Sequence, residues 1–366
     1  MFASPSFRAQ WWQRLATLKA GDEAGFNRAA LDLFAWQFRR NAPYRAWCRA
    51  EGVHDPRAVA DWRAIPAAPQ ELFKEKTLYC HPLRTARALY RTSGTTTGKR
   101  GLQRLLSTDL YQAAALRTVG TLGFLRSPER VPLLCLTASP GENPHSSLSA
   151  MLGFFIAAHG ERRRSRFFVE ADRLRLDLLG KALKQAEERG TPVGLLGTAF
   201  SFVHLLDSDL GTLRLPIKLP KGSFLMETGG FKGRSREVAK PRLYRDLAAR
   251  LGLPASSLWN EYGMTELSSQ AYSRGPAGEH RVPPWTRVVP IDPATGKAQP
   301  KGRKGLLRWL DLANVDGVLA LDTADLGTAA TQDYQRFKLI GRLPQLPRRG
   351  CSLDAEELQT PTQAQT

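Results

Sequence analysis

The sequence predicts an α/β fold with a mixed, largely parallel sheet and packed helices. Between residues 131 and 262, short apolar segments alternate with segments of helical periodicity. Strand–helix–strand order at this spacing favours right-handed crossovers between parallel strands. The chain has 366 residues, 42% of them hydrophobic and 24% charged, which is typical of globular domains and excludes disorder and coiled coils. This length indicates roughly two domains or one large α/β unit.

The helices and strands follow from this alternation. Amphipathic helices are expected over residues 7–18 and 23–38, in a helix-rich region that prolines interrupt before residue 90. Asp172 is expected to cap a helix that Gly190 ends, and Ser235 to begin one that ends near Gly252. Short strands and turns are expected from about Thr286. Buried strands are expected at residues 131–136, 193–196, 223–226 and 258–259.

The chain is basic, with 53 Lys and Arg against 34 Asp and Glu, for a net charge of +19. Such a field attracts nucleotides, acidic proteins, anionic lipid or nucleic acid. Arginine is dense at residues 162–166, but no RNP, helix-turn-helix or zinc-finger pattern accompanies it. A solvated basic face is the simpler interpretation, and no specific nucleic-acid partner is expected.

The cysteines and apolar segments indicate the compartment. Cys48, Cys80, Cys135 and Cys351 lie far apart with no CxxC pair, which excludes a zinc ribbon and disfavours a disulfide framework. A reducing compartment is expected. The first residues lack the apolar core of a signal peptide, and the longest apolar stretch, 151–158, is shorter than the roughly 20 residues of a membrane-spanning helix. We therefore expect a cytoplasmic protein without a transmembrane segment.

Residues 90–100, YRTSGTTTGKR, form the strongest chemical motif. A tight Ser/Thr/Gly loop can direct backbone N–H groups, hydroxyls and a lysine at an anion. A Walker loop requires four residues between its glycines and a hydroxyl after the lysine, whereas here three residues intervene and Arg100 follows the lysine. Read alone, the segment could also be an ordinary exposed turn. The expected phosphate contacts are Thr92, Ser93, Gly94, Thr95, Thr96, Thr97, Gly98 and the charged Lys99.

A second motif, WNEYGMTE, follows a strand at residues 259–266. Tyr262 offers an aromatic face for a purine. Glu266 offers a hard oxygen ligand for Mg²⁺, and Thr265 offers a phosphate contact. Alone, this segment could be a strand end with a core aromatic. Together with the first motif it indicates a nucleotide site.

With both motifs, the chain resembles the adenylate-forming superfamily of acyl- and aryl-CoA ligases, marked by such a phosphate loop and a later [YF]-G-x-T-E segment. The resemblance implies ATP and Mg²⁺. It also implies the large N-terminal domain fold of those enzymes. It places Asp325, in LDTAD at 321–325, on the ribose hydroxyls, and Arg342, at the start of a hinge segment, on the nucleotide. It assigns nucleotide contacts to Gly229 and Gly230, and to Tyr262 and Gly263.

Within that superfamily the chain is most similar to the LuxE-type acyl-protein synthetases of bacterial fatty-acid reductase. Residues 72–74, 228–233 and 349–353 carry this likeness. It implies that Cys351 accepts the acyl group, and Arg348 and Arg349 would favour its thiolate. It also implies that the mobile C-terminal lysine domain of CoA ligases is absent. The expected division is a helix-rich part at 1–90, an adenylating core at 91–350 and a short tail at 351–366.

Two departures from the family pattern stand out. Thr97 is inserted before Gly98 in the phosphate loop, and Pro344 occupies the aspartate position of the hinge segment. The first bears on the backbone geometry of the loop. The second is expected if no mobile domain follows the hinge. A Ser-His-Asp hydrolase is unsupported, because the chain has no G-x-S-x-G elbow.

The sequence thus predicts an ATP-dependent acid–thiol ligase. It would activate a carboxylic acid, fatty by the resemblance, as an acyl-adenylate and transfer the acyl group to Cys351 for a partner such as an acyl reductase. The catalytic residues would be Lys99, Thr265 and Cys351. Transfer to coenzyme A or a carrier protein, and an idle nucleotide- or acyl-binding subunit, remain alternatives. The apolar segments 148–158 and 200–206 are more typical of core than of an acyl pocket.

Overall fold

The computed structural model describes residues 4–92, 100–126, 129–207, 216–229 and 238–343. These residues form two compact units, each assembled from separate chain segments. Of the described residues, unit 1 comprises 4–83, 100–101 and 284–343, and unit 2 comprises 84–92, 102–126, 129–207, 216–229 and 238–283. The division of the sequence at residues 90 and 350 remains a prediction.

Unit 1 combines N-terminal helices with an antiparallel sheet in the order β12-β13-β14-β15, and β1 pairs with β14 in parallel. The predicted helices at 7–18 and 23–38 are confirmed. Side-chain oxygens of Ser4 and Asp22 cap them by accepting backbone N–H groups. The elements are α1 (Pro5–Thr17), α2 (Glu23–Arg40), α3 (Ala42–Ala50), η1 (Pro56–Ala58), η2 (Trp62–Ala64), β1 (Ala68–Pro69), α4 (Leu72–Glu75), β12 (Thr286–Ile291), β13 (Lys304–Asp311), β14 (Ala320–Ala329) and β15 (Arg336–Arg342).

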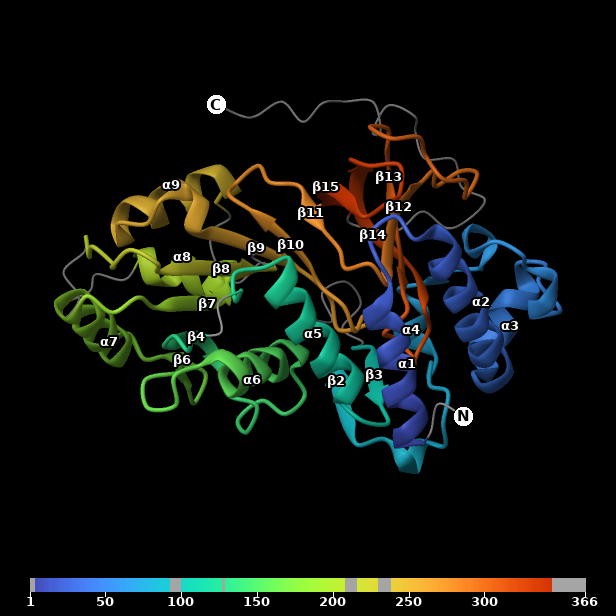
Figure 1. Cartoon of the computed structure of the whole chain (residues 1–366), viewed down its shortest axis with the longest axis horizontal. Helices are drawn as coiled ribbons and strands as arrows, with labels where there is room; N and C mark the ends of the chain where they lie inside the picture. Colours follow the sequence, from blue (N-terminus) through green and yellow to red (C-terminus); the bar gives the residue numbers. More distant parts are fainter. Residues whose placement is uncertain (1–3, 93–99, 127–128, 208–215, 230–237, 344–366) are drawn as a thin grey trace. The chain divides into compact units, whose positions relative to one another are not determined.

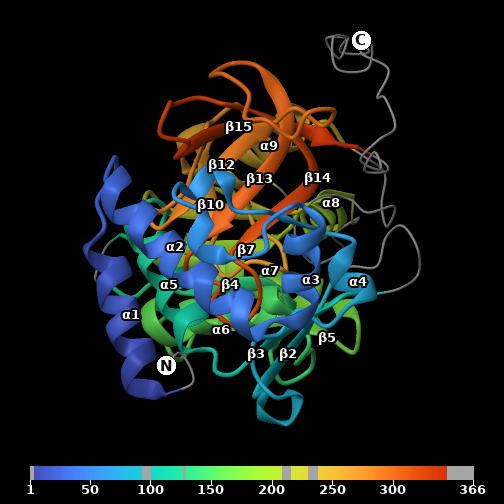
Figure 2. The same cartoon turned by 90° about the vertical axis from the view of Figure 1, so that its right-hand side faces the viewer.

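Helices α1 and α2 are joined to the segment that connects β13 to β14. Arg8 Nη1 donates to Asp316 Oδ1 at 2.8 Å, and both side chains are almost fully buried. Trp11 Nε1 donates to the carbonyl of Leu312 at 3.0 Å, and Gln37 Nε2 donates to that of Asn314 at 2.8 Å. These contacts satisfy the polar groups that the helices bury, so the helices (Figure 2) belong to the same core as the sheet.

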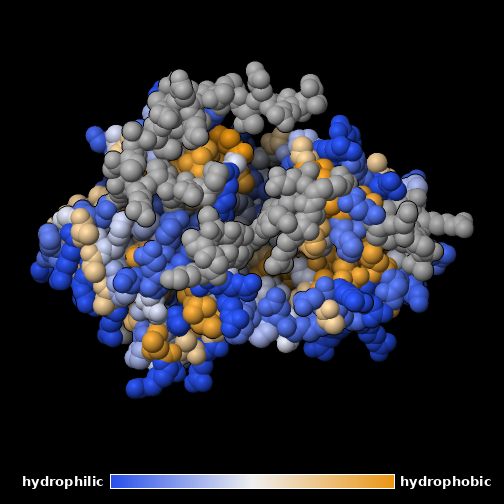
Figure 3. Space-filling view, turned by 180° about the vertical axis from the view of Figure 1, so that it is seen from behind, coloured by the Kyte–Doolittle hydropathy of each residue, from blue (hydrophilic) through white to orange (hydrophobic). Residues whose placement is uncertain are grey.

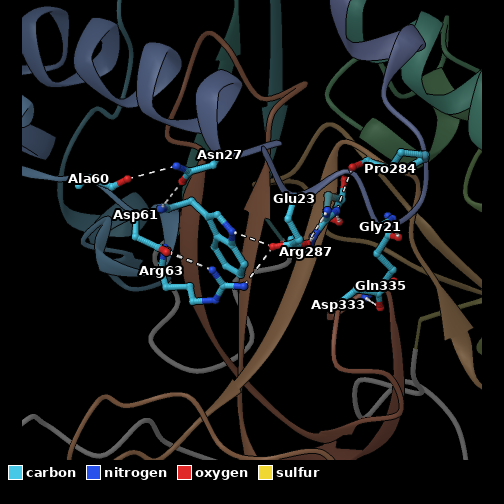
Figure 4. A network of polar contacts seen from close by, with 12 residues as sticks. Gly21, Glu23, Asn27, Ala60, Asp61, Arg63, Pro284, Arg287, Asp333 and Gln335 are labelled. Atoms are coloured by element: carbon cyan, nitrogen blue, oxygen red, sulfur yellow. Dashed lines mark hydrogen bonds and ion pairs between the residues drawn. The ribbon is translucent and has the colours of Figure 1, made fainter. Parts of the chain in front are cut away.

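A buried arginine links α2 to β12 (Figure 4). The Arg287 side chain has 0% exposure. Its Nε and Nη2 donate to Glu23 Oε1 at 3.2 and 3.1 Å, and its Nη1 donates to the carbonyl of Pro284 at 2.9 Å. The guanidinium lies 4.0 Å from the centre of the Phe26 ring. Burial lowers the pKa of Arg287, and Glu23 opposes that effect.

Unit 2 contains the predicted parallel sheet. Its strand order is β11-β10-β9-β8-β7-β4-β5-β6, and the five strands from β9 to β5 are parallel. The strands β10, β11 and β6 are antiparallel additions, and β2 and β3 form a separate hairpin. The strands are β2 (Ala88–Arg91), β3 (Leu102–Leu105), β4 (Leu133–Ala138), β5 (Arg166–Glu170), β6 (Arg173–Leu174), β7 (Gly194–Thr198), β8 (Phe224–Thr228), β9 (Leu258–Tyr262), β10 (Ala271–Arg274) and β11 (His280–Arg281).

Helices cover both faces of this sheet (Figure 1). Successive strand residues point to opposite faces, so Leu133 and Cys135 join the core beside α5 and α6, whereas Leu134 and Leu136 join the core beside α7, α8 and α9. The two-sided burial explains why the strands are continuous apolar segments. The helices are α5 (Asp109–Thr121), α6 (Ser147–His159), α7 (Leu176–Arg189), α8 (Ala199–Asp207) and α9 (Lys240–Leu251), and η3 (Leu83–Thr85) and η4 (Ala255–Ser257) are short 3-10 helices.

The sequence predicts helix starts at Asp172 and Ser235. Asp172 does not cap a helix: it lies at φ +60° between β5 and β6, and α7 begins after Arg175. A two-strand ribbon, Val169 to Leu174, occupies the place of the expected first turn. Gly190 does end α7, in the left-handed conformation at φ +62°. Ser235 lies outside the described residues, and α9 begins at Lys240.

On the face that Figure 3 shows, hydrophilic residues border several apolar patches. Among the described residues, no helix is long and apolar enough to cross a membrane.

We predict that Glu23→Ala lowers the free energy of unfolding by about 2 kcal/mol, because it leaves the buried Arg287 guanidinium without its anionic partner. Asp32→Ala is the matched control, since it removes the carboxylate of a surface pair with Arg14 from the same helix and should cost under about 0.5 kcal/mol. Urea unfolding monitored by circular dichroism measures both. Equal losses for the two variants would contradict the prediction.

Candidate functional site

The chain segments that leave β8 and β9 meet at one edge of the unit 2 sheet, because the two strands are parallel neighbours. Thr228 ends β8, and Gly229 follows it at φ +74°, a conformation that favours glycine. Tyr262 ends β9 and leads into the predicted loop. The predicted Gly229, Tyr262, Gly263 and Thr265 therefore lie at neighbouring strand ends.

A row of polar side chains crosses these strands on the α9 face. Glu227, fully buried, pairs across the strands with Asn260, whose Nδ2 donates to Glu227 Oε2 at 2.8 Å. The Tyr244 hydroxyl donates to the same oxygen at 3.0 Å, and Lys240 Nζ lies 3.6 Å from it. His280 Nε2 lies 2.7 Å from Asn260 Oδ1, and with the amide oriented in this way the ring nitrogen is the donor. The carboxylate is thus held by several donors.

Burial shifts the pKa values of Glu227 and His280, the two ends of this row, in opposite directions. It raises the pKa of the Glu227 carboxyl, while Lys240, Tyr244 and Asn260 lower it. It lowers the pKa of His280 to about 3, with a further contribution from Lys240. His280 is therefore neutral in the folded protein, in agreement with its role as a donor to Asn260.

A second row lies on the α5 and α6 face. Thr228, Glu261 and Tyr272 are cross-strand neighbours on β8, β9 and β10, and all three are buried. The Thr228 hydroxyl donates to Glu261 Oε2. A Cβ atom at Gly263 would lie 2.5 Å from Glu261 Oε1, so a larger residue there would displace the carboxyl. The Glu261 carboxyl thus contacts both chain segments that leave the sheet.

The Glu261 carboxyl has an unusual protonation equilibrium. Burial raises its pKa from the ordinary 4.5 to about 7, and repulsion from Glu227 adds to this effect, while the hydrogen bond from Thr228 opposes it. A carboxyl that titrates near neutrality in a predicted nucleotide site is a candidate functional group. The sequence reading counted Glu261 only as part of the motif, since nothing in the sequence shows its pairing with Thr228.

Thr265 connects the second motif to the first. Its hydroxyl donates to the carbonyl of Arg91 at 3.4 Å and lies 3.3 Å from Ser147 Oγ, at the start of α6. Arg91 directly precedes Thr92, which is buried at 6% exposure. The structure therefore brings Thr92 and Thr265 to the same region of unit 2, as the pairing of the two motifs predicted.

Two further residues of the second motif are buried. Tyr262 is 9% exposed and packs edge-on against His280, and Glu266 is 2% exposed. No group of three or more His, Cys, Asp and Glu side chains could hold a metal ion within the described ranges. Any cation here would need ligands from a bound substrate or water besides the protein. Stacking by Tyr262 and metal binding by Glu266 remain predictions.

Asp325 and Arg342 come together in unit 1. They face each other on β14 and β15, with Arg342 Nε 3.9 Å from Asp325 Oδ1. Arg342 Nη2 also donates to Gln70 Oε1 at 2.9 Å. The positions outside the described residues are Ser93, Gly94, Thr95, Thr96, Thr97, Gly98, Lys99, Gly230 and Cys351.

Comparison with known families identifies the chain. The model of the LuxE acyl-protein synthetases matches residues 15–360. The chain belongs to the LuxE acyl-protein synthetase family. This membership confirms the family resemblance and the prediction of an acyl-protein ligase.

Two curated relatives cover most of this LuxE-family chain. The long-chain-fatty-acid–luciferin-component ligase of Vibrio harveyi is 20% identical over 343 residues, which are 90% of this chain and 87% of that protein. The ligase of the same name from Aliivibrio fischeri is 21% identical over 336 residues, covering 88% and 85%.

Solved structures confirm the predicted fold class. An open conformation of 2-hydroxyisobutyryl-CoA ligase superposes with a TM-score of 0.66 at 14% identity, over 90% of this chain and 77% of that one. ATP-bound MatB from Rhodopseudomonas palustris has a TM-score of 0.50 at 17% identity, over 78% of this chain and 52% of its own. The fold of this family member is thus shared with a CoA ligase and with MatB.

We predict that Glu261→Gln reduces the pH dependence of stability. Because folding raises the carboxyl pKa from 4.5 to about 7, the folded protein binds a proton that the unfolded chain lacks between these values. Raising the pH through this window therefore destabilises the wild type, by up to about tenfold in the unfolding constant per pH unit.

Urea unfolding between about pH 5 and pH 8 measures this effect. The expected result is a wild-type stability that falls relative to Glu261→Gln as the pH rises. The control is Glu188→Gln, which makes the same chemical change on an exposed face of α7 and should parallel the wild type. Parallel curves for all three proteins would refute the prediction.

Proposed function

We propose that the chain uses ATP to activate a carboxylic acid and then transfers the acyl group to a thiol. The acid's carboxylate attacks the α-phosphorus of ATP, so that a C–O–P bond forms and pyrophosphate leaves. A thiolate then attacks the acyl carbon and AMP leaves, giving a thioester. The observation that carries this proposal is the hydrogen bond from Thr265 to Arg91, which joins the two predicted nucleotide motifs.

The proposed adenylation depends on alignment and charge neutralisation rather than on acid–base chemistry. The Thr92–Lys99 segment would hold the phosphates, and the Thr265 hydroxyl would turn from the Arg91 carbonyl to donate to an α-phosphate oxygen. Asp325 and Arg342 would contact the ribose and the nucleotide. Gly229, Gly230, Tyr262 and Gly263 would flank the adenine.

The donor chemistry suits Mg²⁺. Mg²⁺ keeps several waters and binds through one or two carboxylates together with substrate phosphates. Glu266, beside Thr265, would be the protein ligand. Bound there, the ion would neutralise phosphate charge.

Three of the four cysteines are poor acyl acceptors. Cys48, Cys80 and Cys135 are buried, and burial raises the pKa of each thiol, that of Cys48 to about 12. Since the thiolate is the nucleophile, these thiols are unreactive near neutral pH. We therefore propose Cys351 as the acceptor, as the family resemblance implies.

The substrate and partner follow from the relatives. Both curated relatives are named for long-chain fatty acids and a luciferin component, so a long-chain acid is the proposed substrate here. An acyl reductase is the proposed recipient of the acyl group.

We expect Thr265→Val to lower kcat for acid-dependent ATP–pyrophosphate exchange by about 100-fold, the effect of removing one donor to developing charge. Thr121→Val is the control, because Thr121 ends α5 and its hydroxyl donates to the carbonyl of Arg117. Steady-state exchange at saturating ATP measures both. Unchanged turnover in a folded Thr265→Val protein would remove Thr265 from the proposed machinery.

Acyl transfer is tested by incubating wild type, Cys351→Ser and Cys135→Ala with Mg-ATP and labelled acids, followed by denaturing electrophoresis. We expect hydroxylamine-labile label on wild type and Cys135→Ala, and none on Cys351→Ser. AMP release without protein label would move the acceptor to coenzyme A or a carrier protein. No AMP release with any acid would instead favour an idle binding subunit.

A further inference from the structure

A cavity of about 610 Å³ lies in unit 2 between β2, the loop before α6, and α6 itself. Its size falls in the range of small-molecule sites. Apolar side chains from all three segments line it: Ala88, Leu89, Tyr90, Pro140, Pro144, Ala150 and Phe154. Because such surface gains free energy when it leaves water, the cavity suits an apolar ligand.

The walls of this cavity are fixed by hydrogen bonds. His145 Nδ1 lies 2.9 Å from the carbonyl of Leu89 and must donate, since a carbonyl only accepts. The backbone N–H of Arg91 donates to the carbonyl of His145 at 2.9 Å. These bonds join the loop before α6 to β2, so the cavity is preformed.

One end of the cavity reaches the candidate site. Tyr90 and Ser146 line it, and the residues that follow them, Arg91 and Ser147, are the two that Thr265 contacts. The Tyr111 ring packs against both Tyr90 and Phe154, with centroids 5.9 and 5.6 Å apart. An aromatic wall therefore runs from the Thr265 end into the cavity.

Residues of α6 line the cavity at different distances from its Thr265 end. From the Thr265 end, α6 advances about 1.5 Å per residue, so Ala150 lies about 4.5 Å and Gly153 about 9 Å beyond Ser147. Both residues line the cavity. A Cβ atom at Gly153 would lie 3.0 Å from Pro140 Cγ, so glycine leaves the gap between helix and loop open there.

Charge at the Thr265 end favours an anionic head group. Arg91, which ends β2 beside Thr265, is exposed and has no carboxylate partner among the residues that the structure describes. An exposed cation at the end of an apolar cavity attracts the anionic end of a ligand with a hydrocarbon part.

We propose that this cavity holds the hydrocarbon chain of the acid substrate, with its carboxyl end toward Thr265 and its chain along α6. The inference rests on the proposed function, because it locates the substrate of that reaction. Ala150 and Gly153 then limit chain length at two depths, and Ala150 lies nearer the reacting end.

The test compares wild type, Ala150→Leu, Gly153→Leu and the control Ala158→Leu, whose residue is exposed on the same helix and does not line the cavity. Binding of labelled hexadecanoic acid is measured by equilibrium dialysis without ATP. ATP–pyrophosphate exchange is measured with straight-chain acids of increasing length. Circular dichroism and urea unfolding establish that each variant is folded.

We expect Ala150→Leu to lower kcat/KM for hexadecanoic acid by at least about tenfold, the loss when about two methylene groups no longer reach apolar surface. Short acids should react as in wild type. Gly153→Leu should tolerate longer acids than Ala150→Leu does, and Ala158→Leu should match wild type. Two variants at different depths keep the test informative if one fails to fold.

The outcomes separate this inference from the proposed function. If wild type exchanges pyrophosphate and both folded cavity variants match Ala158→Leu for every acid, the cavity assignment is overturned and the activity stands. If wild type binds hexadecanoic acid without exchange, and both variants lose binding, the cavity assignment stands and the activity is overturned. Neither binding nor exchange in wild type would overturn both.

Discussion

Two carboxyl groups buried in adjacent strands constrain unit 2. An unpaired carboxylate away from water is costly, so Glu227 and Glu261 each need polar partners. Tyr244 and Lys240 of α9 supply part of this need for Glu227. The neighbouring strands supply the other donors in the observed register, in which Glu227 faces Asn260 and Thr228 faces Glu261. A slip of one residue would exchange the faces of all these side chains. The polar pairs therefore fix where Gly229 and Tyr262 leave the sheet, and with them the candidate site.

In unit 1 the buried charged group is a guanidinium rather than a carboxyl, and it too must find partners in the fold. Arg287 is fully buried, and its guanidinium is satisfied by Glu23 and by the carbonyls of Pro284 and Thr286. Because these partners lie on different segments, the arginine requires α2 to be docked before it can be buried. In both units a buried ionisable group specifies an arrangement that apolar packing alone would leave degenerate.

The sequence predicted elements wherever one local pattern dominated. Residues 5–17 and 23–40 carry helical periodicity and capping oxygens, and both are helices. Prediction failed at Asp172, because aspartate is favoured both at helix N-caps and in turns. Only the pairing of β5 with β6 decides between the two positions. The sequence also does not show that Glu261 pairs with Thr228, because the two residues are 33 positions apart. Such partners depend on tertiary register rather than on local sequence.

The distribution of these constraints explains how the fold persists at 14% identity to a CoA ligase. Strand and helix cores accept many apolar substitutions if volume and alternation are kept. The strand ends accept few, because the Glu261 carboxyl accepts a hydrogen bond from Thr228 and lies where a Cβ atom at Gly263 would be. Divergence can therefore accumulate in the core and in the walls of the cavity beside α6. Substrate preference can then change there while the strand-end geometry beside Thr265 is retained.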